Sequence, residues 1–155
     1  MKRVIGVMAV LSLLTAVGAV VGTGTAEAAA SCTSYTTFYG VESSGYWTQQ
    51  LPTVGFDTAN VNCVLGVGNR GSAVQTLQHA LNVCYVPYDF KPVLKEDGIY
   101  GTKTQAAVKA VQSAIGIPHD GVYGPQTRSH LNWPSTWSGG GVPVSCFEDL
   151  FDFPF

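Results

Sequence analysis

An eight-residue motif occurs twice in the chain and constrains the possible fold more than any other feature. Residues 97–104 read DGIYGTKT, and residues 120–127 read DGVYGPQT. In each copy the Asp-Gly pair favours a tight reversal, because Asp caps turns and Gly reaches positive φ. A second echo links residues 74–81 to residues 108–115, where apolar residues recur at three- and four-residue steps beside a glutamine. The two repeats together predict helices that are separated by equivalent turns.

The apolar spacing predicts three helices, at 72–84, 103–115 and 125–131. Ser72 suits the start of the first helix as an N-cap, and Pro125 suits the first turn of the third. We therefore expect an all-α fold, a small three-helix bundle stapled by disulfides, with irregular flanks rich in aromatic residues.

The chain divides into four parts by composition. These are a signal peptide at 1–30, an N-terminal flank at 31–59, the helical domain at 60–133 and a C-terminal tail at 134–155. Of the aromatic residues, 6 lie in the N-terminal flank and 5 in the tail. We expect these side chains to pack over the helical core; the alternative is a ligand surface that stacks on sugars or contacts a partner protein.

The first 30 residues have the pattern of a secretory signal peptide. A basic start at Lys2 and Arg3 precedes an apolar run and a small-residue exit, so cleavage is expected after Ala28 or Ala30. A retained membrane anchor is the alternative, because the apolar run is longer than an ordinary signal core. Cleavage predicts a secreted, extracellular protein with no stable membrane insertion.

Four cysteines lie beyond the signal segment, and an even number in an oxidising compartment predicts two disulfides. Sequence alone allows three pairings. We expect a local Cys63–Cys84 bond nested inside a Cys32–Cys146 bond that ties the chain ends together. A catalytic or metal-binding cysteine is the competing interpretation, but no CxxC spacing favours it.

Charge argues against a nucleic-acid partner. The chain carries 8 Lys and Arg against 10 Asp and Glu, a net charge of −2. Removal of Lys2, Arg3 and Glu27 with the signal segment makes this −3. Nucleic-acid binding needs a basic stripe that displaces counterions, and this composition does not supply one.

The repeated DGxxGxxT motif, together with the Ala107-Val108-x-x-x-Gln112 helix, resembles the three-helix family of bacterial peptidoglycan-binding domains. The resemblance covers roughly residues 63–131. It implies a non-catalytic protein that is held on the glycan-peptide mesh of the cell wall, with glycan or stem peptide as its ligand. One departure is Val111, because the family commonly has Phe before this glutamine.

The candidate ligand-binding residues come from the repeats and the third helix. Free amides at helix starts, tyrosine rings and glutamine amides suit sugars, and an arginine suits a stem-peptide carboxylate. The competing interpretation is structural, with the tyrosines as core plugs, the glutamines bonded to local backbone and the arginine solvated. The candidates are Gln78, Asp97, Tyr100, Gln112, Asp120, Tyr123 and Arg128.

We expect no catalytic residues, metal or cofactor. His79, His119 and His130 are scattered without an HExxH motif, and no pair of carboxylates stands out for glycoside hydrolysis. The expected function is therefore a secreted, cell-wall associated, non-catalytic peptidoglycan-binding protein. The alternative is a secreted accessory or inhibitor protein that uses the same scaffold to bind a wall hydrolase.

Overall fold

A computed structural model of the 155-residue chain describes residues 29–42, 45–85, 93–138 and 144–148. Within these residues, three helices and four strands follow one another. They are β1 (Ser34–Glu42), β2 (Gly45–Thr53), α1 (Ser72–Tyr85), α2 (Thr102–Ala114), α3 (Pro125–His130), β3 (Trp133–Trp137) and β4 (Ser145–Phe147). The prediction of an all-α three-helix bundle is therefore wrong.

The three helices themselves lie where the apolar spacing placed them, to within one or two residues. α1 buries the stripe that contains Val74, Leu77 and Leu81. α2 ends at Ala114, and Gly116 follows its C-cap with a φ of +77°, the left-handed conformation that closes many helices. α3 has Pro125 in its first turn, where the missing amide hydrogen costs nothing.

The flanks form an antiparallel sheet in the order β1-β2-β3-β4. Residues 34–42 and 45–53 make a hairpin, and the tail supplies the other two strands beside it. The expectation of irregular flanks is therefore wrong. Threonine, tyrosine and tryptophan favour extended backbone in these segments, because branched and aromatic side chains fit a pleated surface.

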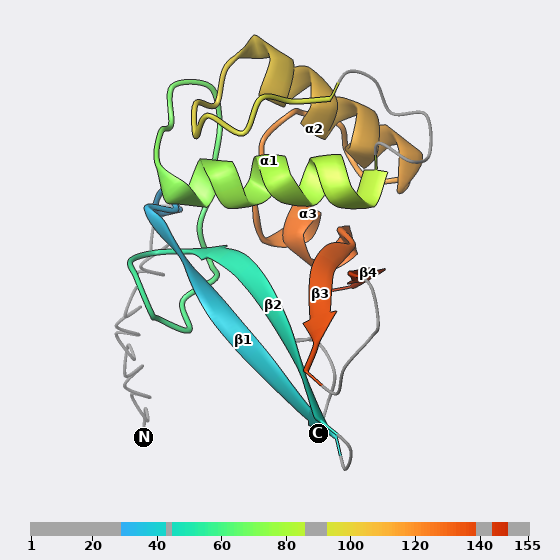
Figure 1. Ribbon diagram of the computed structural model, residues 1–155. Coiled ribbons are helices and arrows are strands. Elements are labelled where there is room, and N and C mark those ends of the chain that lie inside the picture. The colour runs from blue at the N-terminus through green and yellow to red at the C-terminus, as the bar shows by residue number, and fades with distance from the viewer. Residues whose placement is uncertain (1–28, 43–44, 86–92, 139–143, 149–155) are drawn as a thin grey trace, which may run out of the picture.

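The flanks and the helices share one hydrophobic core. Leu51 of β2 and Trp133 of β3 are fully buried together with Leu77 of α1 and Tyr123 of the second turn. In Figure 1 the helices gather at one end of the molecule, while the β1–β2 hairpin extends away from them as a long twisted ribbon. The sheet is thus part of the folded unit, and only its distal end projects beyond the helices.

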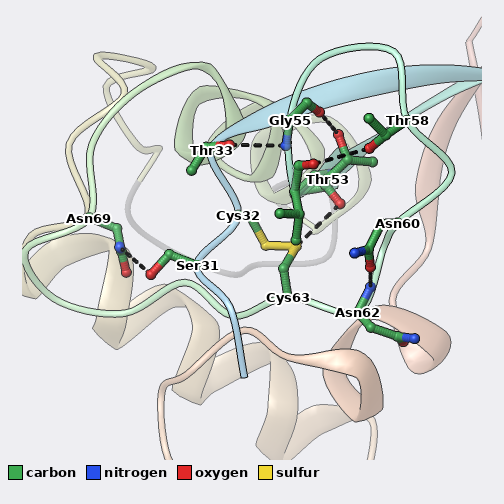
Figure 2. The surroundings of a disulfide bond; sticks show 12 residues. Ser31, Cys32, Thr33, Thr53, Gly55, Thr58, Asn60, Asn62, Cys63 and Asn69 are labelled. Carbon is green, nitrogen blue, oxygen red and sulfur yellow. Dashed lines mark hydrogen bonds between the residues drawn. A yellow bond between two sulfur atoms is a disulfide. The ribbon is translucent and has the colours of Figure 1, made fainter. Parts of the chain in front are cut away.

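The two disulfides join Cys32 to Cys63 and Cys84 to Cys146. Two bonds without a free cysteine were predicted and are confirmed, but the predicted pairing is wrong. Cys32 meets Cys63 because the segment before β1 runs alongside residue 64, where the Cys32 amide donates to the Val64 carbonyl at 3.0 Å. Figure 2 shows this bond surrounded by side-chain to backbone hydrogen bonds of the neighbouring loop.

The second disulfide connects the sheet to the first helix. Cys84 lies in the last turn of α1, and Cys146 lies in β4 at the edge of the sheet. It therefore attaches the final described strand to the helical part of the molecule.

None of the helices in residues 29–42, 45–85, 93–138 and 144–148 is long and apolar enough to cross a membrane. The predicted signal peptide, and with it the alternative of a retained anchor, lies outside the described residues except for Ala29 and Ala30.

Candidate functional site

The first turn of the repeat is held by a buried glutamine of α1. The Nε2 atom of Gln78 donates to Asp97 Oδ1 (3.2 Å), the Ile99 carbonyl (3.1 Å) and Thr104 Oγ1 (3.2 Å). Its Oε1 atom accepts from the Gly98 amide at 2.9 Å. The Asp97 carboxylate also accepts from the Ile99 amide, and this hydrogen bond is the main reason that the pKa of Asp97 is lowered. One glutamine thereby fixes the whole turn against the helix.

The second turn repeats this arrangement atom for atom. The Nε2 atom of Gln112 donates to Asp120 Oδ1 (2.9 Å), the Val122 carbonyl (2.9 Å) and Thr127 Oγ1 (3.0 Å). Its Oε1 atom accepts from the Gly121 amide at 2.8 Å. The sequence repeat is therefore a repeated structural unit, in which glutamine, aspartate and threonine form one closed network. We call each such network a glutamine latch.

The two turns touch each other. The hydroxyl of Tyr100 in the first turn donates to the Gly121 carbonyl of the second at 3.0 Å. Leu65 pairs with Tyr123 through two backbone hydrogen bonds, of 2.8 and 2.9 Å. Both turns thus meet beside the loop that precedes α1, and together they form a rigid centre for the helical part.

Most of the candidate ligand-binding residues lie inside this centre. Tyr100 is 1% exposed and Tyr123 is 0% exposed, so neither ring presents a face to solvent. Burial raises the pKa of the Tyr100 hydroxyl, and the nearby Asp120 charge adds to this effect. Arg128 is also buried, which contradicts the expectation of a solvated arginine. The burial of Tyr100 and Tyr123 agrees with the structural interpretation of the two tyrosines.

The two candidate aspartates remain at the surface, at Asp97 and Asp120. Asp97 lines a shallow hollow beside the first turn, together with Lys95, Ile99 and Lys103. The structure thus brings the candidates together around the two latches, but places ring and amide groups inward. Ligand contact by the seven candidate residues stays a prediction.

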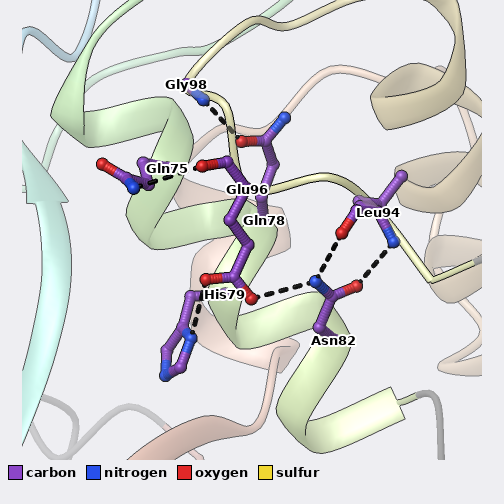
Figure 3. A network of polar contacts seen from close by, with 7 residues as sticks. All are labelled: Gln75, Gln78, His79, Asn82, Leu94, Glu96 and Gly98. Atoms are coloured by element: carbon purple, nitrogen blue, oxygen red, sulfur yellow. Dashed lines mark hydrogen bonds and ion pairs between the residues drawn. The ribbon is translucent and has the colours of Figure 1, made fainter.

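A further polar network holds the segment before the first turn against α1. The Gln75 amide donates to the Glu96 carbonyl at 3.2 Å, and His79 Nδ1 lies 3.1 Å from Glu96 Oε2. Asn82 exchanges two hydrogen bonds with the backbone of Leu94, at 2.8 and 2.9 Å. Figure 3 shows these groups in a row along one side of α1. His79 is therefore part of a surface network with a carboxylate.

A second hollow lies between α1 and the sheet. Thr76 and His79 of α1 line it from one side, and Thr48, Gln50 and Thr136 of the sheet line it from the other. A neighbouring hollow shares three of these residues and continues toward Tyr35 and Glu96. We call the two hollows together the polar groove. Sequence analysis missed this groove, because it is made by strands that the helical interpretation did not contain. Threonine-rich, aromatic-rich segments were the available signal.

In the part of the chain that the structure describes, no three His, Cys, Asp or Glu side chains come close enough to hold a metal ion.

Comparison with known proteins identifies the helical part. Residues 70–131 match the family described as "Putative peptidoglycan binding domain". An uncharacterized protein from the bpoA1 3′ region of Kitasatospora aureofaciens is 36% identical over 85 residues, which are 54% of this chain and 65% of that protein. A probable N-acetylmuramoyl-L-alanine amidase of Bacillus licheniformis is 41% identical over 64 residues, which are 40% of this chain and 18% of the amidase.

A solved peptidoglycan-binding protein from Clostridioides difficile, in complex with glutamine hydroxamate, is also similar. It is 26% identical, with 60% of this chain and 53% of that chain covered and a TM-score of 0.40. The chain spans less than two thirds of the length of each of these three relatives. The similarity to the peptidoglycan-binding family extends over residues 70–131, which contain the three helices and both turns.

Proposed function

We propose, from the match of residues 70–131 to a family of peptidoglycan-binding domains, that the protein is a secreted, non-catalytic protein that binds the cell wall. The observation that carries the proposal is the family match across both glutamine latches. The matched region contains the two complete hydrogen-bond networks that keep its turns in place. A rigid, pre-formed surface suits binding, because little conformational entropy is lost when a ligand docks.

The non-catalytic part of the proposal is supported by how the ionisable side chains are used. His79 is engaged with Glu96, and His130 Nδ1 lies 2.9 Å from the carbonyl oxygen of Gln126. His79 and His130 thus lie in different helices, each beside its own polar partner. The amidase relative lends this chain no catalytic role, because the match covers only 18% of that enzyme.

Secretion is supported by the composition of residues 1–30 and by the two disulfides, which persist in oxidising compartments. One backbone hydrogen bond lies close to the expected cleavage site. The Ala30 carbonyl accepts a hydrogen bond from the Val64 amide at 2.9 Å. Cleavage after Ala28 keeps this bond, so we favour that position over cleavage after Ala30.

Co-sedimentation with purified insoluble peptidoglycan tests the proposal directly. The oxidised protein should move from the supernatant to the pellet at low salt and stay there in about 0.15 M salt, where exposed charges are screened beyond about 8 Å. Protein that stays in the supernatant under both conditions would refute wall binding. Release of soluble muropeptides from the same material would refute the non-catalytic role.

A wall hydrolase is the proposed partner in the second hypothesis, that of a secreted accessory or inhibitor protein. It is favoured by one observation: in the amidase relative, the matching segment belongs to a much longer wall enzyme. A change in the rate at which a purified amidase solubilises peptidoglycan, upon addition of this protein, would support this hypothesis.

A further inference from the structure

One face of the sheet carries hydroxyl, amide and aromatic side chains in adjacent strands. Thr37 of β1 lies opposite Gln50 of β2, and Tyr39 lies opposite Thr48. Thr48 in turn lies opposite Thr136 of β3. Directly paired residues of an antiparallel sheet project to the same side, and so do residues two apart in one strand. These five side chains therefore occupy one continuous face across three strands.

The same face continues onto the distal end of the hairpin as an exposed aromatic pair. Tyr39 is 65% exposed and Tyr46 is 45% exposed, and their ring centroids are 5.9 Å apart. Tyr46 is paired with Val41, which is exposed as well. Figure 1 shows that this end of the hairpin lies away from the helices. Exposed tyrosine rings of this kind are available to contact a ligand, because each offers an apolar face and a polar hydroxyl.

At its other end the face runs under α1 into the polar groove. Thr76 and His79 of the helix stand opposite the threonines of the sheet there. The run from Tyr35 to Val41 covers six residue steps, about 20 Å at the rise of a β-strand. A surface of this length suits an extended polymer better than a small compact molecule.

We propose that this face binds an uncharged saccharide chain, and hence the glycan strand of the wall. We call it the sheet strip and define it by Thr37, Tyr39, Tyr46, Thr48, Gln50 and Thr136. Sugar hydroxyl and acetamido groups form hydrogen bonds with neutral donors and acceptors such as hydroxyl and amide groups, and the apolar side of a sugar ring packs on an aromatic face. The strip provides both kinds of contact and carries no charge.

Charge distinguishes this ligand from the stem peptide. A carboxylate would be recognised by arginine or lysine, which form charge-assisted hydrogen bonds. The ionisable side chains that line the groove in the described part of the chain are instead Tyr35, His79 and Glu96. The inference rests on the proposed function for the identity of the polymer. It adds a site outside residues 70–131, since every member of the sheet strip lies in the flanks.

Two probes and three variants test the inference. The probes are insoluble peptidoglycan and a hexamer of β-1,4-linked N-acetylglucosamine, which carries no peptide. Tyr39→Ala/Tyr46→Ala removes the aromatic pair, and Thr48→Val removes one hydroxyl but keeps the β-branch that suits a strand. Phe147→Ala is the matched control, because Phe147 is an aromatic residue of similar exposure, 42%, on the opposite face of the sheet. Thermal unfolding checks that all three fold.

The double tyrosine variant should raise the Kd for the hexamer about tenfold or more, as expected for loss of two aromatic contacts. Thr48→Val should raise it about two- to tenfold, the effect of one hydrogen bond. Phe147→Ala should stay within about twofold of the wild type, as expected of a contact outside the site. Amide chemical shifts should move in 37–39, 46–50 and 136 upon titration.

The outcomes separate the two proposals. Wild-type protein that binds the wall but not the hexamer, or a tyrosine variant that binds both normally, would overturn the sheet strip and leave wall binding intact. Hexamer binding that depends on the tyrosines, without any wall binding, would support the strip and refute the proposed function. Binding of neither probe would refute both.

Discussion

Replacement of Gln112 by leucine tests whether the glutamine latches hold the domain together. The change keeps a similar side-chain volume but removes the amide group from a buried site. The Asp120 carboxylate keeps its hydrogen bond from the Val122 amide, and the Val122 carbonyl keeps its bond from Thr127. The buried Gly121 amide, in contrast, loses the side-chain acceptor at 2.8 Å.

The expected loss of stability follows from these changes in hydrogen bonding. A buried donor left without a partner costs about 1–3 kcal/mol, and the net loss of the Nε2 hydrogen bonds adds about 1 kcal/mol. Gln112→Leu should therefore lower the free energy of unfolding by about 2–4 kcal/mol. At about 3–5 °C per kcal/mol for a domain of this size, Tm should fall by roughly 10 °C.

Urea unfolding of the oxidised protein, followed by tryptophan fluorescence, measures this free energy from the midpoint at a constant m-value. Gln78→Leu should lower the free energy of unfolding by a similar amount, because the first latch has the same pattern of partners. Gln75→Leu is the control, since this exposed glutamine of the same helix makes one side-chain bond, to the Glu96 carbonyl, and a change of about 0.5 kcal/mol or less is expected. If Gln112→Leu were as stable as this control, the latches would not be structural, and the glutamines would again be candidates for ligand binding.

Three further outcomes are expected. Cys84→Ala/Cys146→Ala should lower the free energy of unfolding by about 4 kcal/mol on the loop-entropy model, since the bond spans 62 residues; a wild-type peptide map that joins Cys146 to any other cysteine would contradict the pairing. Burial raises the pKa of Tyr100, so its contribution to stability is complete below about pH 10 and is lost as the pH rises above that value. Tyr100→Phe should lower the free energy of unfolding by about 1 kcal/mol at neutral pH. Above about pH 10, urea unfolding should show that the variant loses stability less steeply than the wild type. Parallel pH curves of the two proteins would show that the hydroxyl does not titrate as argued. Mass spectrometry of the secreted protein should find Ala29 as the first residue, which retains the Ala30 hydrogen bond; a shorter mature chain would contradict this.

The sequence by itself determined the helices and the equivalence of the two turns. Both depend on residues close together in the chain: a helix needs apolar groups every three or four residues, and a turn needs Asp-Gly at one point. The structural interpretation of Tyr100 and Tyr123 could also be made from the sequence, because it depends only on residues close to them in the chain. Each tyrosine follows a reversal and precedes a helix, so its ring is directed to the centre between them.

The sequence indicated the strands only in part. Residues 34–42 are rich in threonine and aromatic residues, which favours a strand. However, both faces of β1 carry such residues, so the apolar-polar alternation that marks a half-buried strand is missing. The segment therefore lacked the periodic signal that made the helices easy to recognise.

Tertiary structure alone decided the strand order, the disulfide partners and the composition of the sheet strip. β3 pairs with β2 although the paired residues are about 90 positions apart in the chain, and Cys146 reaches Cys84 because β4 extends that sheet. Loop-closure entropy grows slowly with chain length, so it barely distinguishes one distant partner from another. The strand order and the disulfide partners are selected by the hydrophobic core that Leu51 and Trp133 share with the helices. Packing of this kind depends on residues from the whole chain.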